Sequence, residues 1–193
     1  LSLQEVTPDI ETFSVDEAFL DITHCQTLHG DPVDIAKWVK TVVYEASGLQ
    51  CSVGLSGDKT TAKYAAGLDK PDGLTIIHPD DAKARLANVP VTELCGIGKR
   101  TGHYLAEHGV FVCGDMASLP ISQLAKRFGN IGRRMWYMCQ GEDPDEVHVV
   151  VPPPKSIGHG KVTPPKLNNK DNILTYLSHM VEKVAIRLRR HKL

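Results

Sequence analysis

The spacing of apolar residues divides the first 78 residues into short strands and two helices. From residue 35 to 43 an apolar residue recurs every three or four positions, which is typical of one buried helix face. Asp31-Pro32 and Gly48 are start and stop signals for this helix. Strands are expected over residues 10–14, 17–23, 51–56 and 74–77, and a second helix over residues 59–68. This order predicts an α+β layer in which a mixed sheet packs under two helices.

The strand pattern disappears between Pro79 and about Gly141. Glycines and prolines separate short helical stretches there, which predicts an all-helical subdomain with helices over residues 80–87, 99–108, 121–128 and 130–140. A proline-rich linker follows, and beyond it a strand over 155–163 and an amphipathic helix over 171–190 are expected. These last elements predict the start of a further α/β domain.

Composition narrows the class of protein. The 193 residues are 41% hydrophobic and 23% charged, as in an ordinary soluble globular protein. No apolar run approaches the roughly 20 residues of a membrane span, so no membrane partner is expected. The five cysteines are scattered without a Cys-x-x-Cys pair, which argues against a zinc site or disulfide framework and favours a reducing, cytoplasmic setting. Because the chain opens at Leu1 inside an apparent element, we expect it to be a piece of a longer protein.

Charge is distributed unevenly along the chain, although the net charge is only −1. Residues 1–36 contain eight acids and no Lys or Arg, whereas residues 152–193 contain nine bases and two acids. An acidic end that binds cations and a basic end that binds phosphates would suit a metal-dependent enzyme acting on nucleic acid. The alternative is a dipolar surface without function.

The segment Ser14 to Asp21 carries the most specific chemistry. Asp16 and Glu17 are adjacent carboxylates between apolar residues, in a segment patterned as a strand. Paired acids on a rigid strand can hold divalent ions beside a reacting phosphate. The alternative interpretation is a solvated turn that happens to contain two acids.

The junction between residues 54 and 59 is a candidate phosphate contact. A strand ends there and a helix begins, so backbone amides and the charge of Lys59 could meet a phosphate, with Lys63 one turn further on. The segment is not a Walker-type loop, and an ordinary strand-to-helix turn remains the alternative.

A Gly-x-Gly turn at Gly96-Ile97-Gly98, followed by Lys99 and Arg100, is typical of a helix-hairpin-helix that contacts duplex phosphates irrespective of sequence. A plain helical hairpin is the alternative. Residues 128–134 repeat a degraded form of this pattern, which we interpret mainly as packing. Past the linker, Lys155 and Ser156 begin a basic segment that could lie along a sugar-phosphate backbone.

In order and in residues, these motifs resemble those of the Y-family translesion DNA polymerases, in particular the bacterial UmuC/DinB-like group. Lys70-Pro71-Asp72-Gly73 belongs to the same set of motifs. The resemblance implies a palm over residues 1–78, a thumb with a helix-hairpin-helix over 79–145, a linker over 146–154 and the start of a little finger over 155–193. It also implies DNA-directed DNA synthesis in DNA repair.

The resemblance assigns roles to individual residues. Asp16 and Glu17 would be two of three carboxylates that hold two Mg²⁺ ions, and Lys59, with Lys63 beside it, would contact the incoming nucleotide. The amides of Gly96 to Gly98, with Lys99 and Arg100, would hold duplex phosphates, and Lys155 and Ser156 would begin a strand that tracks the DNA. Implied partners are primer-template DNA and an incoming dNTP, and a sliding clamp of the full-length protein is left open.

Family members carry a further metal-binding Asp and the fingers upstream of this start. We therefore expect the chain by itself to bind DNA weakly and not to polymerise. A non-catalytic DNA-binding module is the main alternative, in which the hairpin and the basic tail do all the work. A nucleotide cyclase is a third interpretation, but it has no use for the hairpin.

Overall fold

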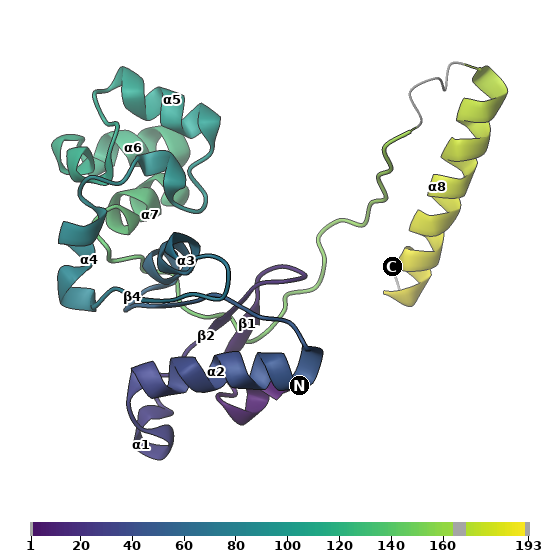
Figure 1. The fold of residues 1–193 in the computed structure, drawn as a ribbon. Helices are drawn as coiled ribbons and strands as arrows, with labels where there is room; N and C mark the ends of the chain where they lie inside the picture. Colours follow the sequence, from purple (N-terminus) through teal and green to yellow (C-terminus); the bar gives the residue numbers. More distant parts are fainter. Residues whose placement is uncertain (1, 164–168, 192–193) are drawn as a thin grey trace. The chain divides into compact units, whose positions relative to one another are not determined.

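A computed structural model describes residues 2–163 and 169–191. The chain divides into two compact units, one up to Val150 and one from Val151 onward. Figure 1 shows the strands and most of the helices in the first unit and the long helix α8 in the second. None of the helices in the described ranges is both long and apolar enough to cross a membrane.

The amino-terminal part of the first unit contains the four predicted strands. β1 (Ile10–Thr12) and β2 (Ala18–Leu20) form an antiparallel hairpin, and β3 (Val53–Leu55) pairs in parallel with β4 (Leu74–Ile76). The pattern predicted one mixed sheet, but the described strands form two separate two-stranded sheets, because neither pair hydrogen-bonds to the other. The short helices η1 (Ser2–Glu5) and α1 (Gln26–His29) pack against the helix that follows them, α2 (Pro32–Ser47).

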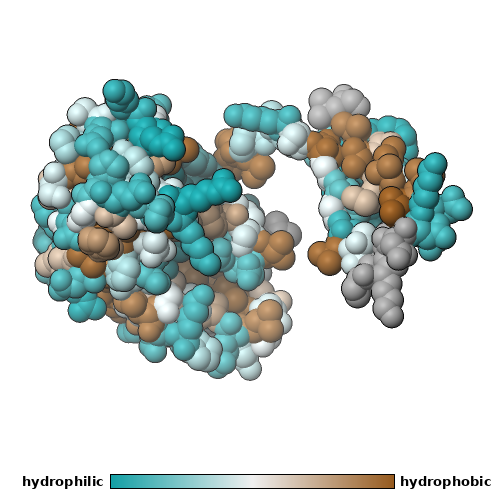
Figure 2. Space-filling model, turned by 90° about the horizontal axis from the view of Figure 1, so that it is seen from above, coloured by the Kyte–Doolittle hydropathy of each residue, from teal (hydrophilic) through white to brown (hydrophobic). Residues whose placement is uncertain are grey.

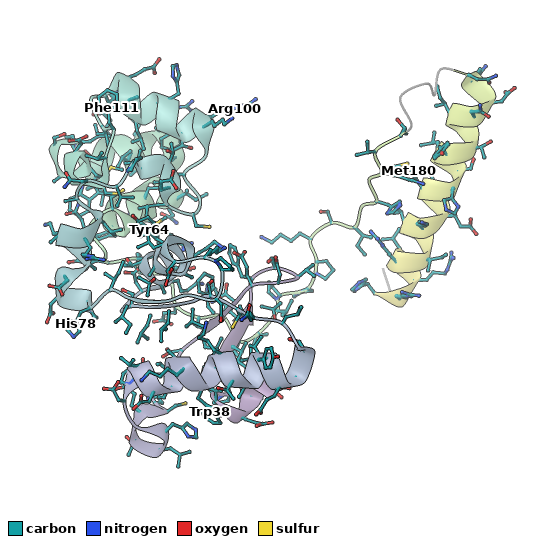
Figure 3. The ribbon with its side chains drawn as sticks, in the orientation of Figure 1. Trp38, Tyr64, His78, Arg100, Phe111 and Met180 are labelled. Atoms are coloured by element: carbon teal, nitrogen blue, oxygen red, sulfur yellow. The ribbon has the colours of Figure 1, made fainter. Side chains whose placement is uncertain are left out.

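The two predicted helices of this part are confirmed with their caps. α2 (Pro32–Ser47) begins where the Asp31 side chain accepts a hydrogen bond from the Val33 N–H, and it ends at Gly48, whose φ is 69°. α3 (Lys59–Leu68) begins where Asp58 accepts the N–H of Thr61. Trp38 of α2 packs on a small core that contains Ile35, Val42 and Val6 (Figure 3).

β3, α3 and β4 form a tight crossover, and Gly54 sets its spacing. An added Cβ at Gly54 would lie 1.9 Å from the carbonyl oxygen of Ala62 and 2.4 Å from the nitrogen of Ala66. β3 and α3 can therefore approach this closely only because residue 54 has no side chain.

The helical part confirms the predicted all-helical subdomain. Leu86, Leu105, Met116 and Leu124 lie in its buried apolar core, and Tyr64 of α3 packs against that core (Figure 3). Its elements are α4 (Pro79–Leu86), η2 (Val91–Glu93), α5 (Lys99–Glu107), η3 (Cys113–Ser118), α6 (Ile121–Phe128) and α7 (Asn130–Met138).

The second unit differs from its prediction at one point. The helix is confirmed as α8 (Lys170–Arg190), but the strand predicted over 155–163 is wrong, since no described residue offers that segment a strand partner. The segment instead runs beside α8, where the Arg187 guanidinium donates to the Gly158 carbonyl at 2.5 Å. Leu177 and Val181 of α8 are more than half exposed. Figure 2 shows hydrophobic residues, in brown, on the surface of this unit.

The close approach at Gly54 generates a prediction. Gly54→Ala should destabilise the chain by about 1–3 kcal/mol, because the methyl group overlaps the α3 backbone. The matched control is Gly67→Ala on the exposed side of α3, where nothing lies within 4 Å of the added Cβ. That variant should be neutral or stabilising by up to about 1 kcal/mol, because alanine favours helix. Chemical denaturation followed by circular dichroism measures both, and equal effects would contradict the assignment.

Candidate metal and nucleic-acid site

Asp16 and Glu17 lie in the turn between β1 and β2, and both are exposed. The turn is closed by the N–H groups of Phe13 and Ser14, which donate to the Glu17 carbonyl at 2.9 and 3.1 Å. The Ser14 hydroxyl oxygen lies 2.8 Å from Asp16 Oδ1 and 3.3 Å from Glu17 Oε2. The two carboxylates therefore face a common point at the tip of the hairpin.

The donor set at this point consists of carboxylate oxygens, which are the ligands that Mg²⁺ prefers. The pair therefore fits part of a magnesium site. Within residues 2–163 and 169–191, no three His, Cys, Asp or Glu side chains come together in an arrangement that could hold a metal ion. The described residues thus provide two carboxylates at the hairpin tip.

α3 brings Lys63 to this pair. The Lys63 ammonium forms an ion pair with Glu17 Oε1 and lies 4.8 Å from the centre of the Phe13 ring. Phe13 in turn packs edge-on against Phe19, with ring centres 5.2 Å apart. A cation and two carboxylates therefore share one exposed surface, supported by an aromatic pair.

Lys59, one helical turn earlier, is in a different environment. Its side chain is only 8% exposed, and its ammonium donates to Glu11 Oε2 at 2.6 Å, Asp145 Oδ2 at 2.7 Å and the Glu146 carbonyl at 2.9 Å. An ammonium has three protons, and all three are used here. A nucleotide phosphate could bind Lys59 only by displacing one of these partners, so the predicted contact stays a prediction.

Ionisation in this cluster follows the pairing. Burial alone would lower the pKa of Lys59, but the hydrogen bonds and charges of Asp145 and Glu11 outweigh it and raise the pKa. Burial likewise opposes ionisation of Glu11 and Asp145. Bonds from the His148 backbone and Lys59 to Glu11, and from Lys59 and His148 to Asp145, nevertheless hold the pKa of both carboxyls below the ordinary value. All three groups are therefore stabilised in their charged forms.

A second ion pair ties the helical part to the same cluster. The Arg134 guanidinium of α7 donates to Asp143 Oδ1 at 2.8 Å and Oδ2 at 2.9 Å, and it lies 3.0 Å from Asp145. The Thr60 hydroxyl donates to Asp143 at 2.5 Å. The sequence did not indicate this network, which contains Glu11, Arg134, Asp143 and Asp145. The segment around Asp143 carried only the signal of a proline-containing linker, residues 128–134 were interpreted mainly as packing, and Glu11 lies 48 residues from its partner Lys59.

The predicted duplex-binding turn has the backbone that such a contact needs. Gly96 has a φ of +94°, which favours glycine, and Gly98 immediately precedes α5. Ile97 is 2% exposed and anchors the turn in the helical core. Lys99 and Arg100 begin α5 and are exposed, and Arg100 extends away from the helical body (Figure 3). In the second unit, Lys155 and Ser156 are exposed.

Comparisons with known proteins identify the family of this chain. The model of the impB/mucB/samB family matches residues 2–67, that of the DNA polymerase-iota thumb domain matches 92–143, and that of the impB/mucB/samB family C-terminal domain matches 154–193. The chain belongs to the Y family of DNA polymerases. The thumb match contains the whole Gly96–Arg100 turn, whereas the domain boundaries at 78 and 145 stay predictions.

Individual relatives support the same assignment. DNA polymerase IV of Moorella thermoacetica is 39% identical over 97% of this chain and 47% of its own length, and that of Alkalilimnicola ehrlichii is 34% identical over 98% and 53%. A solved Y-family DNA polymerase chimera superposes with a TM-score of 0.77 at 26% identity, covering 95% of this chain and 53% of its own. The chain thus spans about half the length of the curated relatives it matches.

The burial of Lys59 generates a prediction. Lys59→Met should destabilise the first unit by about 3 kcal/mol, because it leaves the partly buried Glu11 carboxylate without a cation and removes one of the cations that face Asp145, which keeps Arg134. Lys63→Met removes an ion pair of similar chemistry that is more exposed and should cost at most about 1 kcal/mol. Urea denaturation at pH 7 compares the two, and equal losses would contradict a special role for Lys59.

The loss of stability in Lys59→Met should depend on pH. The folded-state pKa of Glu11 and Asp145 lies below the ordinary value, so their contribution to stability is present above about pH 4 and is lost as the pH falls through the lowered values. The difference in stability between wild type and Lys59→Met should therefore shrink between about pH 5 and pH 3. A difference that stays constant over this range would show that the carboxylates do not carry it.

Proposed function

We propose that this chain is the part of a translesion DNA polymerase that supplies two metal-binding carboxylates and the duplex-holding thumb. The observation that carries the proposal is the convergence of Asp16 and Glu17 on the Ser14 hydroxyl, with Lys63 paired to Glu17. The relatives named DNA polymerase IV support the same activity for the longer protein. In the proposed reaction the oxygen of a primer 3′-hydroxyl attacks the α-phosphorus of an incoming dNTP. The bond from this phosphorus to the oxygen that bridges to the β-phosphate breaks, pyrophosphate leaves, and the hydroxyl proton passes to water.

Asp16 and Glu17 are the residues that would hold Mg²⁺. When bound, divalent ions neutralise phosphate charge and stabilise the attacking and leaving oxygens. Ser14 orients the Asp16 carboxylate through its hydroxyl. Lys63 balances the charge of Glu17 and places an ammonium where a polyphosphate would approach the pair. A phosphate contact by Lys59 would require exchange with Asp145 or Glu11.

The thumb contributes duplex binding in this proposal. The turn at Gly96 to Gly98 and the start of α5 expose backbone amides, and Lys99 and Arg100 add charge beside them. Such contacts hold a duplex irrespective of its sequence. Lys155 and Ser156 would add a second backbone contact.

The 193-residue chain alone should bind primer-template DNA weakly. It should give no primer extension, because its hairpin tip supplies two of the three metal-binding carboxylates that the family resemblance implies. A polymerase of the family's full length that contains this chain should carry out synthesis.

In that full-length context, Asp16→Asn should reduce synthesis at least about 100-fold, because it removes a charge on which metal binding depends. DNA binding should change less than about twofold. The matched control is Asp34→Asn, which removes an exposed carboxylate whose one ion-pair partner among the described residues is Lys37, and it should leave synthesis unchanged. Primer extension with Mg²⁺ measures both variants, and full activity of Asp16→Asn would overturn the proposal.

Duplex binding, measured beside primer extension, separates this proposal from the alternative of a DNA-binding module without catalysis. Replacing Lys99 and Arg100 by alanine should weaken duplex binding and reduce the salt dependence by about one unit of slope per residue. Intact duplex binding together with absent synthesis in the full-length wild type would favour the module.

A further inference from the structure

The ammonium of Lys40 lies at the centre of a group of oxygen atoms. Lys40 is on α2, and its side chain is 21% exposed. Its Nζ atom lies 2.8 Å from the Cys51 carbonyl oxygen, 2.7 Å from that of Asp72 and 3.2 Å from that of Gly73. The fourth neighbour is Asp72 Oδ1 at 2.5 Å. Four oxygens therefore surround one nitrogen that has only three protons.

These oxygens come from two segments that are distant in sequence. Cys51 precedes β3, Asp72 and Gly73 precede β4, and the cation comes from α2, a third place in the chain. Carbonyl and carboxylate oxygens are acceptors only, so they cannot bond to one another. A group with several protons or a cation at the centre satisfies them together, as when backbone carbonyls replace the hydration shell of K⁺. The Gly73 carbonyl also accepts the Val53 N–H at 3.0 Å.

The backbone around the oxygens is held in place by further bonds. Asp72 adopts a φ of +57°, and its second carboxylate oxygen accepts from Gln50 Nε2 at 3.0 Å. The Gly73 N–H donates to the Ser52 hydroxyl at 3.2 Å. An added Cβ at Gly73 would lie 1.7 Å from the Asp69 carbonyl, so glycine is required there. The Lys70-Pro71-Asp72-Gly73 motif, which the proposed function leaves without a role, is thus the turn that presents three of the four oxygens.

We propose that the oxygens of Cys51, Asp72 and Gly73 form a monovalent-cation site, which Lys40 occupies with a tethered ammonium. Lys40 is accordingly a positioning residue for the turn at residues 70–73 and for the start of β4. In its absence K⁺ or NH₄⁺ fills the site, because both suit oxygen distances near those of the ammonium. This site goes beyond the proposed polymerase function and does not depend on it.

The test uses Lys40→Met in the 193-residue chain, since methionine keeps most of the length of the side chain and removes its charge. Melting temperatures are measured in NH₄⁺, K⁺, Li⁺ and tetramethylammonium chlorides at equal ionic strength. Wild type should melt at the same temperature in all four salts. Lys40→Met should melt several degrees lower in Li⁺ and tetramethylammonium, and NH₄⁺ or K⁺ should restore at least about 3 °C by binding the folded state.

Lys37→Met is the matched control, because Lys37 is on the same helix, is 63% exposed, and within the part of the chain that the structure describes forms an ion pair with Asp34 alone. It should show no dependence on the cation. Lys40→Arg should not recover the wild-type melting temperature, because a planar guanidinium does not fit a site built for a point charge. Equal restoration of Lys40→Met by all four cations, or restoration by none, overturns the proposal.

A measurement on the wild-type chain is independent of whether the variant folds. In proton–nitrogen NMR spectra near neutral pH, the Lys40 ammonium should give a resolved signal, because its protons are held by protein oxygens and exchange slowly with water. The exposed Lys37 and Lys99 should give none under the same conditions. Exchange at Lys40 as fast as at Lys99 overturns the proposal.

Discussion

The ammonium of Lys59 is the point on which the arrangement of the first unit depends. It bonds to Glu11, 48 residues earlier in the chain, and to Asp145, 86 residues later. A buried lysine without partners would shed its proton or leave the interior. The β1–β2 hairpin, the start of α3 and the segment after α7 are therefore held around one charge. Arg134 and Asp143 extend the same network into the helical part.

The candidate metal site follows from this anchor. Lys59 and Lys63 are four residues apart on α3, so fixing the first sets the direction of the second. Lys59 lies over the ring of Phe19 and Lys63 over that of Phe13, at 5.3 and 4.8 Å from the ring centres. The hairpin that carries Asp16 and Glu17 is thereby packed against α3. Replacing a buried ion pair by apolar residues is often neutral in free energy. We therefore infer that the ion pairs of Lys59 serve chiefly to fix the position of the hairpin against α3.

Local signals in the sequence predicted the elements that local interactions control. The period of apolar residues and the caps at Asp31 and Gly48 gave α2, and the pattern over residues 59–68 gave α3 with its observed bounds. The glycines at 96 and 98 likewise indicated the turn before α5. In each case the decisive interactions lie within a few residues of each other.

Long-range partners could not be predicted in this way. The partners of Lys59 and Lys40 lie in distant segments, and no local pattern distinguishes an anchoring lysine from a free one. Whether a segment forms a strand, and which sheet it joins, depends on the segments that lie beside it. This is why the division into two sheets and the irregular backbone over 155–163 could not be predicted. The adjacent acids in a strand pattern indicated the carboxylate pair, and the family resemblance gave it a role, but the packing of Lys59 against Glu11 and Asp145 required the structure.

The central claim is that Asp16 and Glu17 bind a divalent ion at the hairpin tip, and paramagnetic broadening by Mn²⁺ tests it most directly. In NMR spectra of the 193-residue chain, substoichiometric Mn²⁺ should broaden the amide signals of residues 14–18 first. Asp16→Asn should remove that selectivity while the rest of the spectrum stays unchanged. Broadening spread evenly over the exposed carboxylates, or concentrated elsewhere in the chain, would contradict the claim.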